Sequence, residues 1–203
     1  MKEFGKIFPK ATLFFLAMAV VTGIVYPAVI TGISQIAFPF QANGSILVNE
    51  NGETEGSALL AQPFSEDDHL WGRPTSDNYG AFTDGEGNPV YFAGPTNYSP
   101  AGTAEDEAVA ERVEAMKAAN PARGDEAVPV DLVTVSGSGL DPAISPAAAE
   151  YQVPRIAEAS GLSEDQVREI ISENTEGRFL GIFGEPNVNV LKVNLALDEA
   201  MGK

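Results

Sequence analysis

The chain has 203 residues, of which 44% are hydrophobic and 20% are charged, and this composition excludes a long disordered or collagen-like protein. Its 12 basic and 29 acidic side chains give a formal net charge of -17, which excludes nucleic acid as a partner because phosphate backbones are bound by Lys and Arg. The chain has no cysteine, so disulfides, thiolate nucleophiles and thiolate metal sites are excluded as well. His69 is the single histidine, which excludes a zinc protease with two histidines at helical spacing.

An uncharged stretch near the N-terminus predicts one transmembrane helix over residues 11–34. No charged residue occurs between Lys10 and Glu50, and about 20 residues of helix suffice to cross the hydrocarbon core of a bilayer. A cleaved signal peptide is the alternative. Its cleavage site would be Ala17-Met18-Ala19, but apolar residues continue beyond this site, so we favour a retained anchor. The predicted division is an N-terminal segment (1–10), the transmembrane helix (11–34), a juxtamembrane segment (35–45) and a folded domain (46–203).

The basic residues predict how the helix is oriented. Lys2, Lys6 and Lys10 precede it, whereas the first lysine or arginine after it is Arg73. Basic residues are enriched on the cytoplasmic side of membrane helices, so we expect a single-pass protein of the cell membrane with a cytoplasmic N-terminus and an extracytoplasmic C-terminal domain. Residues 41–203 contain 28 of the 29 acidic side chains. We favour solubility or a salty habitat as the reason for this excess over a role in steering cations.

Pro27 lies inside the predicted helix, where it cannot donate a backbone hydrogen bond and presses on the carbonyl group of Gly23. A bend is tolerable there if a neighbouring helix satisfies the freed backbone group. Several residues of the span are small enough to let a second helix pack closely, although a simple tether has the same composition: Thr22, Gly23, Thr31, Gly32 and Ser34.

The first half of the domain is predicted to contain two hairpins and one helix. Ile46–Val48 and Ser57–Leu60 flank a turn-rich segment, and Phe82 and Val90–Phe92 flank a second one. A helix capped by Thr103 is expected to run to Ala119 and to break at Asn120-Pro121.

The second half is predicted to contain two strands and three helices. The apolar residues between Val128 and Val135 indicate a buried strand, and Val188, Val190 and Val193 a second strand. Asp141-Pro142 and Ser145-Pro146 both have the pattern of a helix start, and the helix from Ser145 is expected to bend or restart at Pro154 and to end at Gly161. Ser163 to Gln166 is a capping box that starts another helix, and a short helix is expected over Leu195–Met201. Because strands and helices mix without regular alternation, the predicted fold is a single α+β domain behind one transmembrane helix.

Several residue groups could carry chemistry, but each has a simpler structural explanation. Ser136-Gly137-Ser138-Gly139 follows a predicted strand, where backbone amides can bind phosphate, yet it lacks the lysine of a P-loop, and we favour a tight turn. Asp67-Asp68-His69 offers metal-ligating atoms, but we favour a solvated acidic loop because adjacent residues seldom converge on one ion. Structural ion pairs are expected, rather than ligand clamps, at Arg73, Arg112, Arg155 and Arg178. No catalytic residue and no metal site are predicted.

Short motifs occur in a fixed order along nearly the whole chain: Tyr26-Pro27, Phe38-Pro39-Phe40-Gln41-Ala42-Asn43-Gly44-Ser45, Gln62-Pro63-Phe64, Trp71-Gly72-Arg73-Pro74, Ser136-Gly137-Ser138-Gly139-Leu140-Asp141-Pro142 and Gly184-Glu185-Pro186-Asn187-Val188-Asn189-Val190-Leu191. In these motifs the chain resembles the C subunit of the Kdp potassium-transporting P-type ATPase, the KdpC family. Two departures occur. Ala143 stands where the family usually has histidine, and residues 93–100 match the corresponding family segment only loosely.

The resemblance implies a non-catalytic accessory subunit of an ATP-driven potassium uptake complex. The partners that it implies are a potassium-translocating subunit, a P-type ATP-hydrolysing subunit and a small single-span subunit. The family is described as a catalytic chaperone that raises the ATP affinity of the hydrolytic subunit through a transient ternary complex. The resemblance therefore implies no firmly bound cofactor, and ATP only in that ternary complex. The candidate nucleotide or subunit contacts are Ser136, Gly137, Ser138, Gly139, Leu140 and Asp141, and the candidate subunit contacts in or near the span are Gly23, Tyr26, Pro27, Gln35, Gln41 and Asn43.

The predicted orientation argues against direct contact with ATP, because the nucleotide is anionic and the acidic domain lies on the opposite face of the membrane. We therefore expect an indirect effect on ATP affinity through conformational coupling. A domain that caps or filters the potassium entrance of the translocating subunit is the alternative. Two other classes stay open: a membrane-anchored hydrolase, which would need Ser136, Ser138 or His69 for catalysis, and a membrane-anchored envelope-binding module.

Overall fold

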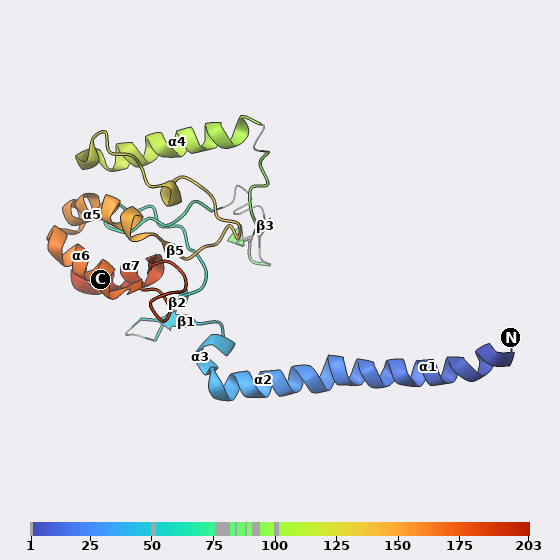
Figure 1. Ribbon diagram of the computed structural model, residues 1–203. Coiled ribbons are helices and arrows are strands. Elements are labelled where there is room, and N and C mark those ends of the chain that lie inside the picture. The colour runs from blue at the N-terminus through green and yellow to red at the C-terminus, as the bar shows by residue number, and fades with distance from the viewer. Residues whose placement is uncertain are drawn as a thin grey trace. The chain divides into compact units, whose positions relative to one another are not determined.

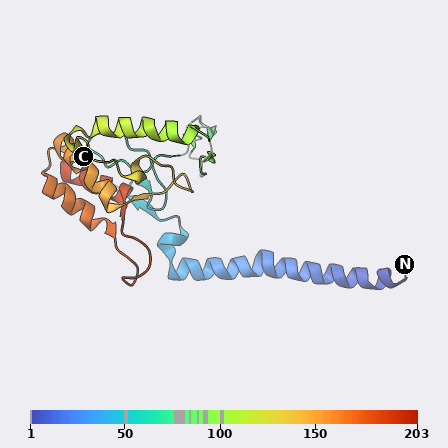
Figure 2. The same cartoon turned by 45° about the horizontal axis from the view of Figure 1, so that its top comes forward.

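The computed structural model describes residues 2–49, 52–75, 82–83, 85–87, 89–90, 94–99 and 102–203. The chain forms two compact units, residues 1–46 and 47–203, which Figures 1 and 2 show as ribbons. The first unit is helical, and the second mixes helices with short antiparallel strands, so the predicted α+β class is confirmed.

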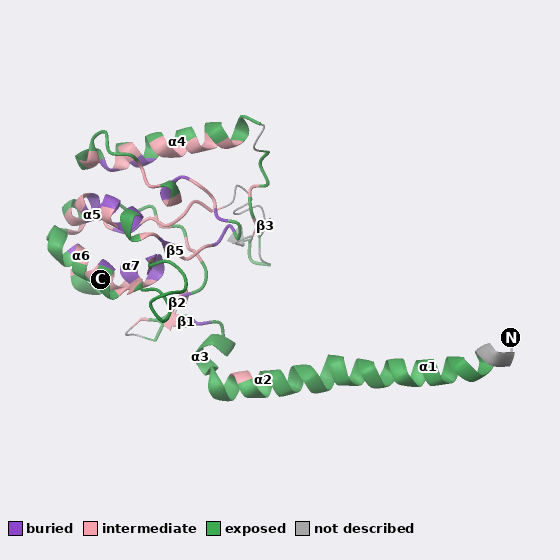
Figure 3. Ribbon diagram, in the orientation of Figure 1, coloured by how far each residue is buried: buried purple, intermediate pink, exposed green. Residues whose placement is uncertain are grey.

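The first unit is one long apolar helix followed by a short one. Its helical elements are α1 (Lys2–Val20), the π-helical turn η1 (Val21–Val25), α2 (Tyr26–Ala37) and, after a bend at Phe38, α3 (Pro39–Ala42). Gly5–Ala37 is long and apolar enough to cross a membrane, and none of its most apolar window is buried within the chain (Figure 3). The helix predicted over residues 11–34 lies inside this stretch.

The π-helical turn accommodates Pro27. A proline in a regular α-helix clashes with the carbonyl group four residues earlier, which here belongs to Gly23. In the structure, the amide of Tyr26 donates to the carbonyl oxygen of Val21, five residues back, so the turn before Pro27 is wider than an α-turn. Pro27 then falls in the first turn of α2, where its missing N–H breaks no bond.

The second unit contains four α-helices, short 3-10 turns and small antiparallel sheets within its described residues. A three-stranded sheet has the order β5-β7-β6, and β1 pairs with β2 and β3 with β4. The strands are β1 (Ile46–Val48), β2 (Thr54–Ser57), β3 (Phe82–Thr83), β4 (Pro89–Val90), β5 (Ala143–Ile144), β6 (Thr175–Glu176) and β7 (Asn187–Asn189). The helices are α4 (Ala104–Ala119), η2 (Pro121–Arg123), η3 (Val130–Leu132), α5 (Pro146–Ser160), α6 (Glu164–Glu173) and α7 (Val190–Met201).

The core of the domain lies around α5 and α7, as the buried residues in Figure 3 show. Helix α5 begins at Ser145, whose hydroxyl accepts the amide of Ala148, and ends at Gly161 in a left-handed conformation. It runs through Pro154 without interruption. Helix α6 begins with the predicted capping box of Ser163 and Gln166. These three helix ends are therefore confirmed.

The strand predicted over Val128–Val135 is wrong. The structure has the 3-10 turn η3 there, in which Thr134 donates both its amide and its hydroxyl to the carbonyl oxygen of Val130. Leu132 and Val133 are buried but Val130 is exposed. Only part of the apolar segment is therefore buried, and it is buried in a turn. The local hydrogen bond of the Thr134 side chain stabilises this turn, where a strand would have paired its backbone with a neighbouring strand.

Two other boundaries differ from prediction. Helix α7 begins at Val190, five residues before the predicted Leu195, because the side chain of Asn189 accepts the amide of Lys192 and caps the helix there. No helix follows Asp141-Pro142: the carboxylate of Asp141 accepts the amide of Ala143 in a local turn, and the strand β5 follows.

The hairpin predictions are confirmed in outline. In the first, the second strand is Thr54–Ser57 rather than Ser57–Leu60. In the second, β3 and β4 pair in antiparallel fashion, with Phe82 opposite Val90, and residues 91–92 of the prediction lie outside the described part. Helix α4 begins after Thr103 as predicted, but the side chain of Thr103 makes no capping bond, so three acidic residues in the first turn interact with the helix dipole instead.

Candidate functional site

The predicted loop from Ser136 to Asp141 turns its polar side chains toward its own backbone. The hydroxyl of Ser136 accepts the amide of Gly139 at 3.0 Å, and the hydroxyl of Ser138 accepts the amide of Leu140 at 3.2 Å. The two hydroxyl oxygens lie 3.1 Å apart. Two of the amides that could have faced a phosphate are therefore already used inside the loop.

Gly139 explains the shape of this loop. Its φ is +70°, and a Cβ at this position would lie 2.2 Å from the carbonyl oxygen of Gly94. Only glycine fits where another backbone approaches this closely in a left-handed conformation. Gly137, by contrast, is exposed and has open space around it within the described structure. This geometry agrees with the tight turn favoured from the sequence.

Arg73 ties the loop to the rest of the domain. Its guanidinium donates to the carboxylate of Asp141 and to the carbonyl oxygen of Thr134, both at 3.3 Å. The carbonyl of Leu140 accepts the amide of Ala61, so a second segment also holds the loop. The loop is thus fixed at both ends, and Arg73 belongs to its support.

Side-chain amides hold the irregular segment that precedes Arg73. Asn194 bonds to both the amide and the carbonyl of Leu70, at 2.7 and 3.0 Å, and Gln152 does the same for Trp71, at 2.9 and 3.0 Å. Each side chain therefore acts as one rung of a β-ladder for a segment that has no strand partner. Because these atoms are buried or nearly so, this network fixes the course of the chain across α5 and α7.

Arg155 completes this network from α5. Its guanidinium donates to the carbonyl oxygens of Asp67 and His69, at 2.6 and 3.0 Å, and lies 4.3 Å from the ring centre of Trp71. Burial lowers the pKa of Arg155 to about 10, because water is removed from the charged group. Arg155 is thus a buried structural cation.

The other arginines singled out in the sequence also have partners within the domain. Arg178 pairs with Glu185, and Arg112 donates to the carbonyl oxygen of Val133 at 3.3 Å. Arg73 has its ion pair with Asp141. The expected ion pairs are therefore confirmed for Arg73 and Arg178, and Arg155 and Arg112 also bond within the domain, through carbonyl groups.

The acidic run at Asp67-Asp68-His69 is solvated only in part, because Asp67 is exposed whereas His69 is buried. The imidazole of His69 lies between two carboxylates, with Nδ1 2.9 Å from Asp68 and Nε2 3.2 Å from Asp198. The ammonium group of Lys203 contacts Asp68 and is the main reason why the pKa of that carboxyl is lowered. Within the described residues, no group of three or more His, Asp or Glu side chains is arranged so that it could hold a metal ion.

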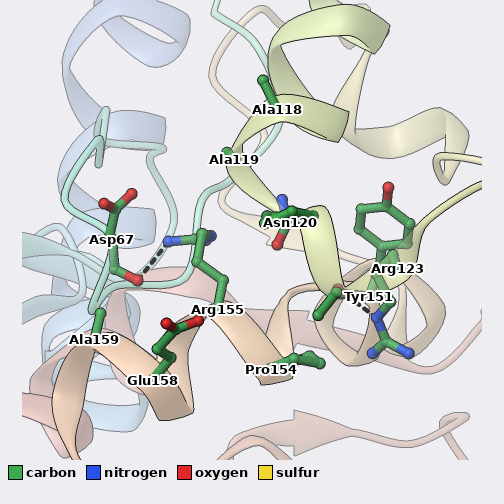
Figure 4. A pocket seen from close by; sticks show the side chains of 12 residues that line it. Asp67, Ala118, Ala119, Asn120, Arg123, Tyr151, Pro154, Arg155, Glu158 and Ala159 are labelled. Atoms are coloured by element: carbon green, nitrogen blue, oxygen red, sulfur yellow. Dashed lines mark hydrogen bonds between the residues drawn. The ribbon is translucent and has the colours of Figure 1, made fainter.

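A cleft of about 440 Å³ opens between the end of α4 and the helix α5 (Figure 4). Burial raises the pKa of the Tyr151 hydroxyl, which with Oδ1 of Asn120 has no hydrogen-bond partner in the described structure. Arg123 at the cleft donates to the carbonyl oxygen of Tyr151 at 2.8 Å. The described lining of this cleft carries no serine, threonine, cysteine or histidine.

The candidate contacts of the first unit fall into two places on the helix. Gly23 lies in the π-helical turn, with Tyr26 and Pro27 directly after it. Gln35 and Asn43 exchange hydrogen bonds between their amide groups, at 3.3 and 3.2 Å, across the bend at the end of α2. Gln41 accepts the amide of Gly44 in the turn after α3. The loop from Ser136 to Asp141 belongs to the other unit.

Sequence reasoning missed one exposed feature. The loop between β6 and β7 carries four large apolar side chains that point into solvent: Phe179, Leu180, Ile182 and Phe183. The detectable pattern was an uncharged run of six residues between Arg178 and Glu185 in an otherwise acidic domain.

A long exposed apolar helix followed by a small α+β domain without a catalytic arrangement in its described part is the organisation of a membrane-anchored, single-pass protein. The family model of the K+-transporting ATPase, c chain, matches residues 8–199. A potassium-transporting ATPase KdpC subunit of Clostridium botulinum (strain Eklund 17B / Type B) is 48% identical over 198 residues, which cover 98% of each chain. The proteins of the same name from Clostridium perfringens and Sorangium cellulosum are each 50% identical, over 95% and 94% of this chain and 97% and 96% of theirs. The chain therefore belongs to the family of KdpC subunits of the K+-transporting ATPase.

Proposed function

We propose that this chain is a non-catalytic accessory subunit that stabilises an ATP-driven, high-affinity potassium uptake complex. Its partners would be a potassium-translocating subunit, a P-type ATP-hydrolysing subunit and a small single-span subunit. The observation that carries the proposal is the match to the family model over residues 8–199. The hydroxyls of Ser136 and Ser138 bond to each other and to backbone amides, whereas the imidazole of His69 faces carboxylates.

We propose further that the domain raises the ATP affinity of the hydrolytic subunit indirectly. The loop from Ser136 to Asp141 contains no basic residue, and the guanidinium that contacts it, Arg73, is already paired with Asp141. A nucleotide phosphate normally needs such cations or free amides. The effect would thus reach ATP through the conformation of the complex, and reciprocity requires that ATP binding in turn favours association with this subunit.

A second role follows from charge. Residues 41–203 hold 28 acidic side chains and 9 basic ones, and a surface of this sign concentrates cations within a Debye length of about 8–10 Å. Placed over the entrance of the translocating subunit, the domain would act as a cap or filter for potassium.

Truncation tests the proposed function. A chain that ends after residue 46, at the boundary of the first unit, keeps the helix and lacks the domain. We expect the full-length chain to copurify with larger membrane proteins in mild detergent, and the truncated complex to show a lower potassium affinity, a lower ATP affinity or a lower yield.

Unchanged potassium-dependent ATP hydrolysis and yield in the truncated complex would contradict a role for the domain. Purification of the full-length chain alone, under conditions that keep the ATPase intact, would favour an envelope-binding module instead.

The proposed orientation has its own test, which uses the absence of cysteine from the chain. Glu114 is exposed on α4, so Glu114→Cys introduces one accessible thiol into the domain. In intact cells, a membrane-impermeant maleimide should label this variant to the same extent as in lysed cells. Labelling only after lysis would place the domain in the cytoplasm and would remove the objection to direct contact with ATP.

A further inference from the structure

The apolar loop between β6 and β7 is a closed hairpin. The amide of Phe179 donates to the carbonyl oxygen of Phe183 at 2.8 Å, and the reverse bond measures 3.0 Å. Leu180 and Gly181 both have positive φ, +54° and +74°. For leucine, this conformation is strained, so the surrounding bonds must maintain the turn. The hairpin therefore holds its side chains outward in one defined arrangement.

These side chains contribute little to the fold of the domain. Phe179, Leu180, Ile182 and Phe183 are 62–74% exposed. Moving them out of water would be favourable, yet the domain itself does not do so. Four large apolar side chains within five residues form a patch of the kind that marks contact with a partner or a membrane.

Other exposed apolar residues belong to the first hairpin of the domain. Val48 is on β1, and Leu59 and Leu60 come shortly after β2. In Figures 1 and 2, β1, β2 and the loop between β6 and β7 lie on the side of the domain that faces away from α4. We call the set Val48, Leu59, Leu60, Phe179, Leu180, Ile182 and Phe183 the apolar end.

The segment that joins the two units limits how far the start of β1 can lie from a bilayer that holds α2. Only residues 38–45 separate the end of α2 from the start of β1, and even fully extended they allow a separation of about 30 Å. β1, where the chain enters the domain, belongs to the apolar end. A tether this short gives the apolar end a high effective concentration at the membrane, so that weak insertion becomes sufficient.

The shape and the charge of the hairpin favour lipid over a protein as its binding partner. The hairpin is a narrow protrusion, and a stable protein interface usually buries about 800 Å² on each side, which a five-residue tip cannot supply. Acyl chains conform to any convex apolar tip. The tip has no charge between Arg178 and Glu185, and these two residues neutralise each other in an ion pair at its base.

From this arrangement we propose that the hairpin Phe179–Phe183 inserts into the acyl boundary of the membrane that holds α1 and α2. The hairpin acts as a second, shallow anchor that limits rotation of the domain about its tether. The inference depends on the proposed membrane anchorage but not on any effect of the domain on ATP. The lipid class is a neutral one, because the remaining acidic surface is repelled by anionic headgroups.

Depth-sensitive fluorescence quenching tests this inference on the full chain. Ile182→Cys places a single thiol on the hairpin, and Glu114→Cys places one on α4 as the matched control. Each variant is labelled with an environment-sensitive dye and reconstituted in phosphatidylcholine nanodiscs, with or without bromine on the acyl chains. Insertion by about 5–10 Å brings the dye within reach of bromine, so we expect at least a twofold loss of fluorescence at position 182 and almost none at 114.

Three other outcomes overturn the proposal. Little quenching at both positions would show that the hairpin stays in water, and equal strong quenching would show non-specific adsorption of the domain. If quenching at position 182 disappears when the other subunits of the complex share the nanodisc, the hairpin binds protein in the assembly. A failure to copurify such subunits would contradict the proposed function while leaving the result for the isolated chain intact.

Discussion

Two loops of the domain direct their side chains in opposite ways. Ser136 to Asp141 is rich in serine and glycine, yet its hydroxyls face inward and satisfy its own amides. Phe179 to Phe183 is rich in large apolar residues, yet its side chains face outward. The polar residues of the first loop are explained by the fold, because they bond to the amides of the loop itself. The apolar residues of the second loop are not explained by the fold, because they are mostly exposed, and their role therefore depends on what surrounds the domain.

The difference also bears on how family motifs should be interpreted. The Ser-Gly-Ser-Gly-Leu-Asp-Pro motif invites a role in nucleotide binding, but four of its residues have a structural task. The hydroxyls of Ser136 and Ser138 bond to each other within the turn. Gly139 permits the close approach of Gly94, and Asp141 forms an ion pair with Arg73. Such a motif can be specific to a family because the fold needs it.

The largest effect that sharpens this comparison is expected at Gly139. Gly139→Ala introduces a Cβ that would meet the carbonyl oxygen of Gly94 and forces alanine into a left-handed conformation. We expect a loss of about 2–4 kcal/mol in the free energy of unfolding, from backbone strain and the displacement of a neighbouring segment. Guanidinium unfolding of the full chain in micelles, followed by the fluorescence of Trp71, the single tryptophan, measures it.

Gly137→Ala is the control in the same loop. Gly137 is exposed, has no positive φ and has open space around it in the described structure, so its replacement should change the free energy of unfolding by less than about 0.5 kcal/mol. Equal losses at both glycines would contradict the role given to the approach of Gly94.

The elements that sequence reasoning predicted well are those whose ends are set by local chemistry. Ser145-Pro146, Gly161 and the Ser163 capping box each satisfy or release backbone groups within a few residues, so the pattern is visible in the sequence. The strand predicted over Val128–Val135 failed because a run of apolar residues does not distinguish a ladder from a buried turn.

The network around Leu70 and Trp71 could not be predicted, because its partners are more than 80 residues away. Gln152 and Asn194 look like ordinary polar residues of two helices, and only the fold brings them to the backbone of the segment before Arg73. The sequence shows the hairpin as an uncharged run of six residues, four of them apolar, but it does not show that these residues are exposed. The same pattern is equally typical of a strand in the core.

The smallest effect is expected in the apolar hairpin. Ile182 is 71% exposed, so Ile182→Ser removes no packing within the domain, and the free energy of unfolding in micelles should change by less than about 0.5 kcal/mol. The matched change is Ile156→Ser on α5, where the side chain is fully buried and the loss should exceed about 3 kcal/mol through cavity formation and a buried hydroxyl. The same two variants compared by Trp71 fluorescence separate packing from exposure, because the chemical change is identical. A loss at Ile182 that approaches the loss at Ile156 would mean that the hairpin packs on the domain, and its apolar side chains would then need no lipid to explain them.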